Sequence, residues 1–183
     1  MAIQKCQYQG PNGETCNDSA KESGWCYWHD RTIKKDEPDL IPRLEQRART
    51  GVPMVGFYLQ GANLRGIDLV NHNNKNGYQL THSDLYHCDL RDAHIFHIDL
   101  TESSLMKANL DHANLNCATL EKVNLLGVHL KNTKIDNVVW GANVLQETQA
   151  SQSVDHSEKL DLYEQAEEIY RNLRRATESQ GLF

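Results

Sequence analysis

Several features that would quickly assign a function are missing from this sequence of 183 residues. No apolar run approaches the ~18 residues needed to cross a bilayer, and the N-terminus has no apolar signal segment. The 19 basic residues are outnumbered by 25 acidic ones, and no segment forms a basic patch of the kind that binds phosphates. We therefore expect a soluble, cytoplasmic protein that does not insert into a membrane and does not bind nucleic acid.

Recognisable catalytic constellations are missing as well. No Ser/His/Asp set, no paired-carboxylate cleft and no glycine-rich phosphate loop is visible. Seven of the nine histidines lie between His72 and His129, but they are spread along the chain and are predicted to be solvated surface residues. Cys88 falls at a predicted inward position and Cys117 at an outward one, so neither looks like a nucleophile. We expect no enzymatic activity.

What the sequence does contain is a strict five-residue period. From Leu80 to Trp140 every fifth residue is apolar, thirteen times in succession, and a smaller residue mostly lies two positions before each. This period fits neither a helix nor a flat strand, so the chain must turn a corner every five residues. Four corners close a coil of about 20 residues, and such coils can stack at the spacing of paired strands. The large and the small residue both point inward, because alternate residues of an extended segment share a face.

The residues that carry this period resemble a known motif. Ala62-Asn63-Leu64, Ala108-Asn109-Leu110 and Ala113-Asn114-Leu115 look like the A-(D/N)-L-x-x motif of the bacterial-type pentapeptide repeat proteins. The resemblance covers about half of the chain. It implies an all-β solenoid, a right-handed quadrilateral β-helix, for residues 52–145.

The repeats begin before the uninterrupted run. Met54 starts the five-residue step, and the Asn-rich segment 71–77 interrupts it. From Leu69 to Leu80 the chain takes eleven residues instead of ten, which predicts one extra residue in a corner loop. Counted through this loop, the sequence gives eighteen repeats, or about four and a half coils.

Residues 1–30 form a second unit with a metal-binding pattern. Cys6, Cys16, Cys26 and His29 are spaced as C-x9-C-x9-C-x2-H. Three thiolates and one imidazole are a tetrahedral zinc set with no open position, which is the structural type, and so short a segment needs such stabilisation. The alternatives are reduced cysteines in an unstructured tail, or a disulfide that leaves an odd thiol. We predict that these four residues bind one structural Zn²⁺.

Two helices are expected to cover the ends of the coils, as solenoids require. In residues 31–51, a charged linker leads to a helix over 39–50 that Asp39 caps and Gly51 ends. In residues 146–183, a polar linker leads to a helix over 155–179, part of which is available for a partner or a homodimer. The apolar stripes predicted to be buried are Leu40, Ile41, Leu44 and Ala48 in the first helix, and Leu160, Tyr163, Ala166, Ile169, Tyr170, Leu173 and Ala176 in the second.

Residues twenty apart should stack from one coil to the next. Tyr86, Met106 and Leu126 are therefore expected to form an outward apolar column, which is either a partner-binding strip or a set of scattered surface residues. Two charged columns are expected on the same grounds: Arg91, Asp111 and Lys131, and His82, Glu102 and Lys122.

Three classes of function fit these features. The first is a non-enzymatic scaffold or protein-interaction module with unknown protein partners. The second follows from residues 169–175 and 178–183, which are similar to the helix after the repeats in some bacterial membrane proteins with ion-channel-like domains; it implies a cytosolic regulatory domain of a larger protein. The third is the family's best-studied activity, DNA mimicry that inhibits a type II topoisomerase. Residues 52–145 hold only nine acidic against seven basic residues, so we favour the first class.

Overall fold

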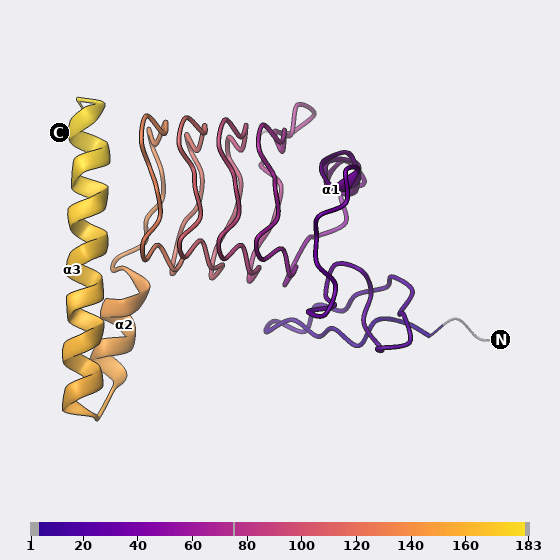
Figure 1. Ribbon diagram of the computed structural model, residues 1–183, viewed down its shortest axis with the longest axis horizontal. Helices are drawn as coiled ribbons and strands as arrows, with labels where there is room; N and C mark the ends of the chain where they lie inside the picture. Colours follow the sequence, from indigo (N-terminus) through magenta and orange to yellow (C-terminus); the bar gives the residue numbers. More distant parts are fainter. Residues whose placement is uncertain (1–3, 75, 182–183) are drawn as a thin grey trace.

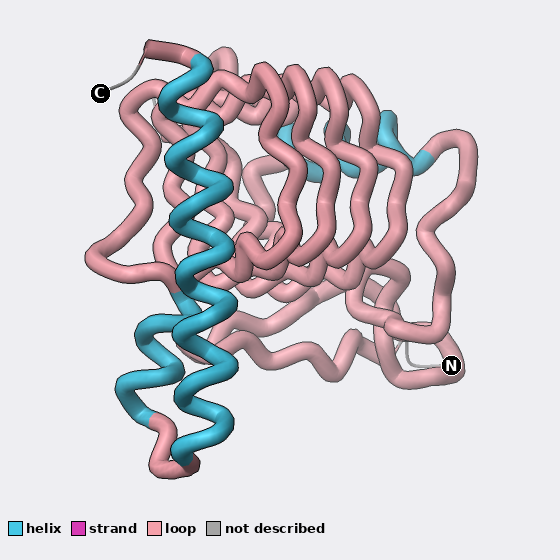
Figure 2. Tube along the Cα trace, turned by 60° about the vertical axis from the view of Figure 1, so that its left-hand side comes forward, coloured by secondary structure: helices cyan, strands magenta, loops and turns pink. Residues whose placement is uncertain are grey.

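The computed structural model describes residues 4–74 and 76–181. Within these residues the helices are α1 (Leu40–Arg49), α2 (Leu145–Gln152) and α3 (His156–Ser179). A stack of coils connects α1 to α2, with α1 at one end of the stack and α3 across the other (Figure 1). The N-terminal segment, which we call the head (residues 4–35), lies beside the first coil (Figures 1 and 2).

Each coil pairs with the next through isolated parallel bridges between residues 20 apart, such as Asp89 with Asn109 and Asn109 with His129. Backbone hydrogen bonds run in the same register, and the amide of Leu90 donates to the carbonyl of Asn109 at 2.7 Å. The chain therefore coils as the five-residue period predicts. The all-β prediction is only partly right, because in the described residues the walls are single bridges rather than strands. Five residues per wall leave room for one bridged residue between two turns.

The interior is filled by the two predicted sets of side chains. Leu105 and Leu110 from the large set and Ala108 from the small set are fully buried. Where the small residue is polar, its hydroxyl donates to a carbonyl: Ser103 Oγ lies 2.8 Å from the oxygen of Leu80. The buried polar groups of the core are thus paired, as a dry interior requires.

The Asp or Asn of the repeat motif has a local role. Its side chain accepts a hydrogen bond from the amide two residues later, as Asp84 does from Tyr86 at 3.1 Å and Asn114 does from Asn116 at 3.1 Å. This Asx turn closes the corner that follows each wall. The motif therefore specifies both the inward residues and the turn.

The corner residues explain many of the histidines. Every fifth residue from His82 to Asn137 has a φ between 54° and 66°. That left-handed conformation disfavours most side chains, and Asn, Asp and His are enriched there. His82, His87, His97 and His112 all occupy such corners. Their number therefore has a backbone explanation.

The Asn-rich loop differs from its prediction. Asp68 pairs with His94, 26 residues away, whereas later coils step by 20. The loop therefore inserts six residues (26 minus 20) into a single corner, and Leu80 follows Leu69 as the next wall. The prediction of eighteen repeats and four and a half coils is wrong: four central residues before the loop and thirteen after it make seventeen, or about four and a quarter coils.

Helix α1 covers the first coil. Its predicted stripe is buried at Leu40, Leu44 and Ala48, and Gly51 after its end has a φ of 72°. The predicted cap is wrong, because the side chain of Asp39 makes no hydrogen bond to the helix. Its backbone, at φ −94° and ψ 7°, lacks the extended conformation that a capping residue needs.

Helices α2 and α3 form a hairpin at the other end. The predicted polar linker is largely α2, which buries Gln146 and Ala150. Helix α3 begins after Asp155, whose side chain accepts from the amide of Glu158 at 2.8 Å.

The predicted stripe of α3 is only partly buried. Ala166, Ile169 and Ala176 are buried, whereas Leu160, Tyr163 and Tyr170 are about half exposed. The reason is length: α3 extends past the edge of the coils, and there it lies beside α2 instead of the stack (Figure 2). None of the helices in the described part of the chain is long and apolar enough to span a membrane. Leu182 and Phe183 lie outside the described residues.

Candidate metal centre

The four predicted ligands converge in the head. Their donor atoms all lie within 4.8 Å of one another, and all four residues are buried. Cys16 Sγ is 3.7 Å from Cys26 Sγ, and His29 Nδ1 is 3.1 Å from Cys26 Sγ and 3.5 Å from Cys6 Sγ. Tetrahedral zinc with ~2.3 Å metal–sulfur bonds would place two thiolates about 3.8 Å apart. The spacing of the donor atoms therefore fits a four-coordinate ion.

Two local structures bring the ligands together. Cys6 and Cys16 lie on opposite arms of a hairpin that is bridged between Lys5 and Ser19 and between Gln9 and Thr15. Cys26 and His29 belong to one tight turn, in which the amide of His29 donates to the carbonyl of Cys26 at 3.2 Å.

Burial keeps the donor groups of the site uncharged when no cation is bound. Burial raises the pKa of the Cys16 and Cys26 thiols, so each is protonated unless a positive charge stabilises its thiolate. Burial also lowers the pKa of His29, which keeps the imidazole neutral and able to ligate. The amide of Cys26 donates to Cys6 Sγ at 3.2 Å, so the tight turn is bonded directly to the hairpin. The arrangement can hold a metal and offers it no open position.

His29 also joins the site to the coils. Its Nε2 lies 2.9 Å from the carbonyl oxygen of Val55 in the first coil. With Nδ1 facing the sulfurs, Nε2 carries the proton and donates this bond, which fixes the orientation of the ring. The Tyr8 ring stacks on the imidazole at 3.9 Å and 7°.

Aromatic packing fastens the rest of the head. The rings of Trp28 and Phe57 stack with centroids 5.0 Å apart and 5° between their planes, and the amide of Tyr58 donates to the carbonyl of Trp28 at 2.8 Å. Arg47 of α1 pairs with Asp18 of the head at 2.8 Å.

The buried side chain of Lys35 also stabilises the head. Its ammonium donates to the carbonyls of Asp30 and Ile33 at 2.9 and 2.8 Å, and it lies 5.0 Å from the centre of the Tyr27 ring. No pattern in the sequence predicts that this lysine is buried. For Phe57 a signal existed, because it is a large aromatic at a position where later repeats mostly hold a small residue.

The residues of the predicted apolar column lie in the expected register. Tyr86, Met106 and Leu126 stand at matching positions of successive coils, and all three are partly buried. Leu126 packs against the core, and Asn124 Nδ2 lies 3.9 Å from Met106 Sδ. The column is far from the metal ligands along the chain and contributes nothing to their site.

One of the two charged columns forms as predicted: His82 Nδ1 is 3.2 Å from Glu102, which lies 2.9 Å from Lys122. In the other column, the Arg91 guanidinium binds Asp89 at 2.6 Å instead of Asp111, and Asp111 accepts from the backbone amide of Lys131 at 2.8 Å. Such contacts at the surface contribute little to stability individually.

Comparisons with known proteins give the repeats a family. Residues 103–139 match the family model described as pentapeptide repeats, in 8 copies. No curated protein matches the chain.

Solved structures of such proteins are similar over about half of the chain. HetL, a pentapeptide repeat protein involved in heterocyst differentiation regulation from the cyanobacterium Nostoc sp. strain PCC 7120, is 28% identical over 48% of this chain and 38% of its own, with a TM-score of 0.43. Rfr23, from the cyanobacterium Cyanothece 51142, is 30% identical over 51% of this chain and 63% of its own, with a TM-score of 0.38. This chain thus covers less than two thirds of either protein. Both TM-scores are below 0.5, so the similarity to the family is based on the match of residues 103–139.

Replacement of Phe57 tests whether the head is fastened as described. Phe57→Ala removes the ring on which Trp28 stacks and is expected to cost about 3–5 kcal/mol of packing at that junction. Limited proteolysis should then cut the linker at residues 31–38 faster, while the coils stay protected. Phe96→Ala, on another wall of the stack, is the control. Equal cleavage rates in the two variants would contradict this docking.

Proposed function

Because this chain contains pentapeptide repeats, we propose that it is a non-enzymatic protein-interaction module. In this proposal the repeats form the right-handed quadrilateral β-helix of the family, and the head is a zinc-stabilised cap on its first coil. The observation that carries the proposal is the cluster of four buried donor atoms, one of whose residues, His29, also bonds the coil through Val55. Such a site binds a metal for structure, because no coordination position is left for a substrate.

Zinc is the metal that the donor set favours. Three soft thiolates with one imidazole select zinc over the harder cations, which prefer oxygen ligands. A head of some thirty residues has few apolar side chains to bury, so a bound ion would supply much of its stability. The thiols must stay reduced to bind it, which favours a cytoplasmic location for the protein.

Metal analysis tests this assignment. Protein purified under reducing conditions should contain about one zinc per chain, and Cys16→Ser should lose it and lower the melting temperature of the head. Cys117→Ser, which alters a corner residue outside the head, should keep the zinc. Wild-type protein without zinc, or zinc retained by the Cys16 variant, would refute the assignment.

The column formed by Tyr86, Met106 and Leu126, here called the apolar strip, is the surface we propose for a protein partner. These side chains are apolar and partly exposed on an otherwise polar surface. In Figure 1, the α2–α3 hairpin and the head both extend beyond the same edge of the stack, one at either end of the coils. The wall that carries the strip is the one that meets both: Gln146 of α2 donates to Asn124, and Asp84 lies beside the head.

A charge in the middle of the strip tests its role. Met106→Glu places a carboxylate among apolar side chains and should abolish partner binding without changing the far-ultraviolet circular dichroism. Partners would be compared by quantitative affinity purification with wild-type protein and with Phe96→Glu, a control at the equivalent position on another wall. Recovery of the same proteins in equal amounts with all three would show that the strip does not bind them.

Helix α3 offers a second surface, which we propose for a homodimer. Leu160, Tyr163 and Tyr170 are 55%, 43% and 45% exposed, although they belong to the apolar stripe of the helix. Light scattering should give twice the mass of 20.9 kDa, and Tyr163→Glu should return the protein to a monomer. A monomeric mass for the wild-type protein at high micromolar concentration would contradict the dimer.

A further inference from the structure

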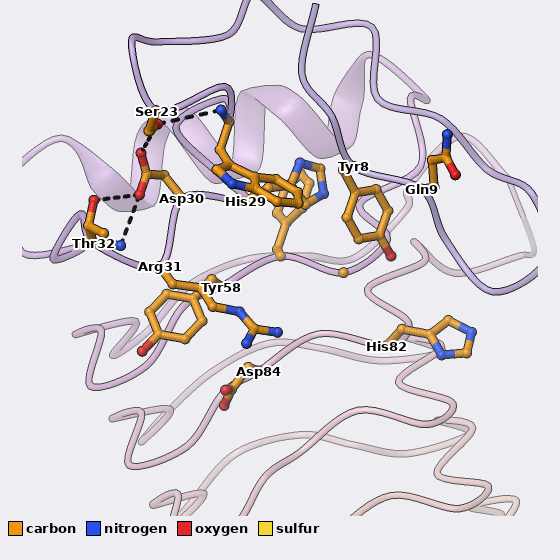
Figure 3. A pocket seen from close by; sticks show the side chains of 13 residues that line it. Tyr8, Gln9, Ser23, His29, Asp30, Arg31, Thr32, Tyr58, His82 and Asp84 are labelled. Carbon is orange, nitrogen blue, oxygen red and sulfur yellow. Dashed lines mark hydrogen bonds between the residues drawn. The ribbon is translucent and has the colours of Figure 1, made fainter.

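A cleft of about 630 Å³ separates the head from the first coil (Figure 3). Aromatic side chains from both sides line it: Tyr8 and Trp25 from the head, and Tyr58 from the coil. Tyr8 is held in place by its stacking on His29, and the floor beneath it includes Gly56. A Cβ atom at position 56 would lie 2.1 Å from the Tyr8 hydroxyl, so this wall of the cleft requires a glycine.

Some hydrogen-bonding groups of the cleft already have partners within the protein, and others do not. Its carboxylates already have partners: the Asp30 carboxylate accepts from Ser23 Oγ at 2.5 Å and from Thr32 at 2.6 and 2.9 Å. Asp84 accepts from the side chain of Gln60 at 2.7 Å and from the amide of Tyr86 at 3.1 Å.

The donors of the cleft, in contrast, are free. The Trp25 indole N–H, the Tyr8 hydroxyl, the Gln9 amide and the Arg31 guanidinium make no side-chain hydrogen bond to any described residue, although all four residues line the cleft. In Figure 3 the Arg31 side chain extends into the space between Tyr58 and Asp84. The cleft thus offers free donors to a ligand. Each carboxylate oxygen of Asp30 and Asp84, in contrast, already accepts at least one hydrogen bond.

The charge of the lining argues against an anion as the ligand. Arg31 is its one permanent cation, and the carboxylates of Asp30 and Asp84 lie on the same lining. A phosphate or carboxylate would meet at least as much negative as positive charge. A ligand that fits is neutral, carries hydrogen-bond acceptors for these donors, and has flat apolar faces for the aromatic rings.

We infer that the cleft binds an extended proline-rich segment of a partner protein. Proline has no backbone N–H, so such a segment presents carbonyl acceptors and ring faces and needs no acceptor from the site. Aromatic grooves with Trp and Tyr donors suit the polyproline II conformation, which is already ordered before binding. This inference rests on the proposed interaction function and names the chemistry of the partner.

The cleft also leads to the apolar strip. Asp84, at the edge of the cleft, is two residues before Tyr86 on the same wall, and Met106 follows one coil further on. A segment that leaves the cleft along this wall would therefore contact the strip next. The two surfaces can act on one ligand.

Nuclear magnetic resonance of the zinc-loaded, ¹⁵N-labelled protein tests the inference with a capped decaproline peptide. The three tryptophans, Trp25, Trp28 and Trp140, each give one indole N–H signal. Titration should shift the Trp25 signal, which is assigned by its loss in Trp25→Phe, and should leave that of Trp140 unchanged. A decapeptide of alternating Gly and Ser, which carries N–H donors and no rings, should cause no shift.

Calorimetry with matched variants completes the test. Trp25→Phe keeps an aromatic ring but removes one donor, and should weaken decaproline binding roughly five- to tenfold, the effect of one hydrogen bond. Trp140→Phe, at the opposite end of the stack, should bind as the wild-type protein does.

Benzoate, a flat aromatic anion, is the probe for an anionic ligand. The inference is overturned if decaproline at several millimolar leaves the Trp25 signal unmoved, if the Gly–Ser peptide shifts it equally, or if benzoate shifts it more. Zinc is measured on the same sample. A sample with one zinc per chain and no peptide binding refutes only the cleft, whereas a folded sample without zinc refutes the proposed head.

Discussion

The backbone hydrogen bonds between successive coils are the constraint on which this structure depends. A five-residue wall is too short to satisfy its own amides and carbonyls, so each coil relies on the coil above and the coil below. Leu90 bonds to Asn109, for example, and Asn109 in turn bonds back to Cys88. The first and last coils lack one neighbour, and the groups left over must find partners elsewhere.

The appended segments supply those partners. At the first coil, His29 and Trp28 of the head bond Val55 and Tyr58, and Glu45 of α1 accepts from the amide of Asp68 at 3.0 Å. At the last coil, Asn172 of α3 donates to the carbonyl of Val128 at 2.6 Å, and Gln180 accepts from the amide of Ile135 at 3.3 Å. The caps therefore do more than cover apolar surface: they also supply some of the hydrogen bonds that a further coil would make.

The need for hydrogen bonds at the first coil links the candidate metal site to the coils. The residue that would ligate the ion through Nδ1 is also the residue that bonds the first coil through Nε2. Order in the Cys3His cluster and order at the end of the stack are thus coupled through one ring. The cleft is a consequence of the same junction, because Tyr8 on the imidazole and Tyr58 on the coil form its facing walls.

The sequence by itself determined the coiling, the inward residues, the ends of α3 to within about one residue and the four residues that could bind a metal, because each depends on local spacing or on residue chemistry. Tertiary structure alone decided where the repeat count resumes after segment 71–77, since a corner can absorb one residue or six without changing the pattern on either side. It also decided which part of the α3 stripe is buried, because that depends on where the coils end. Likewise, the contact of His29 with Val55 and the cleft lined by Trp25 and Arg31 form only where the head packs on the first coil. Neither the five-residue period of the coils nor the Cys/His spacing of the head encodes that contact.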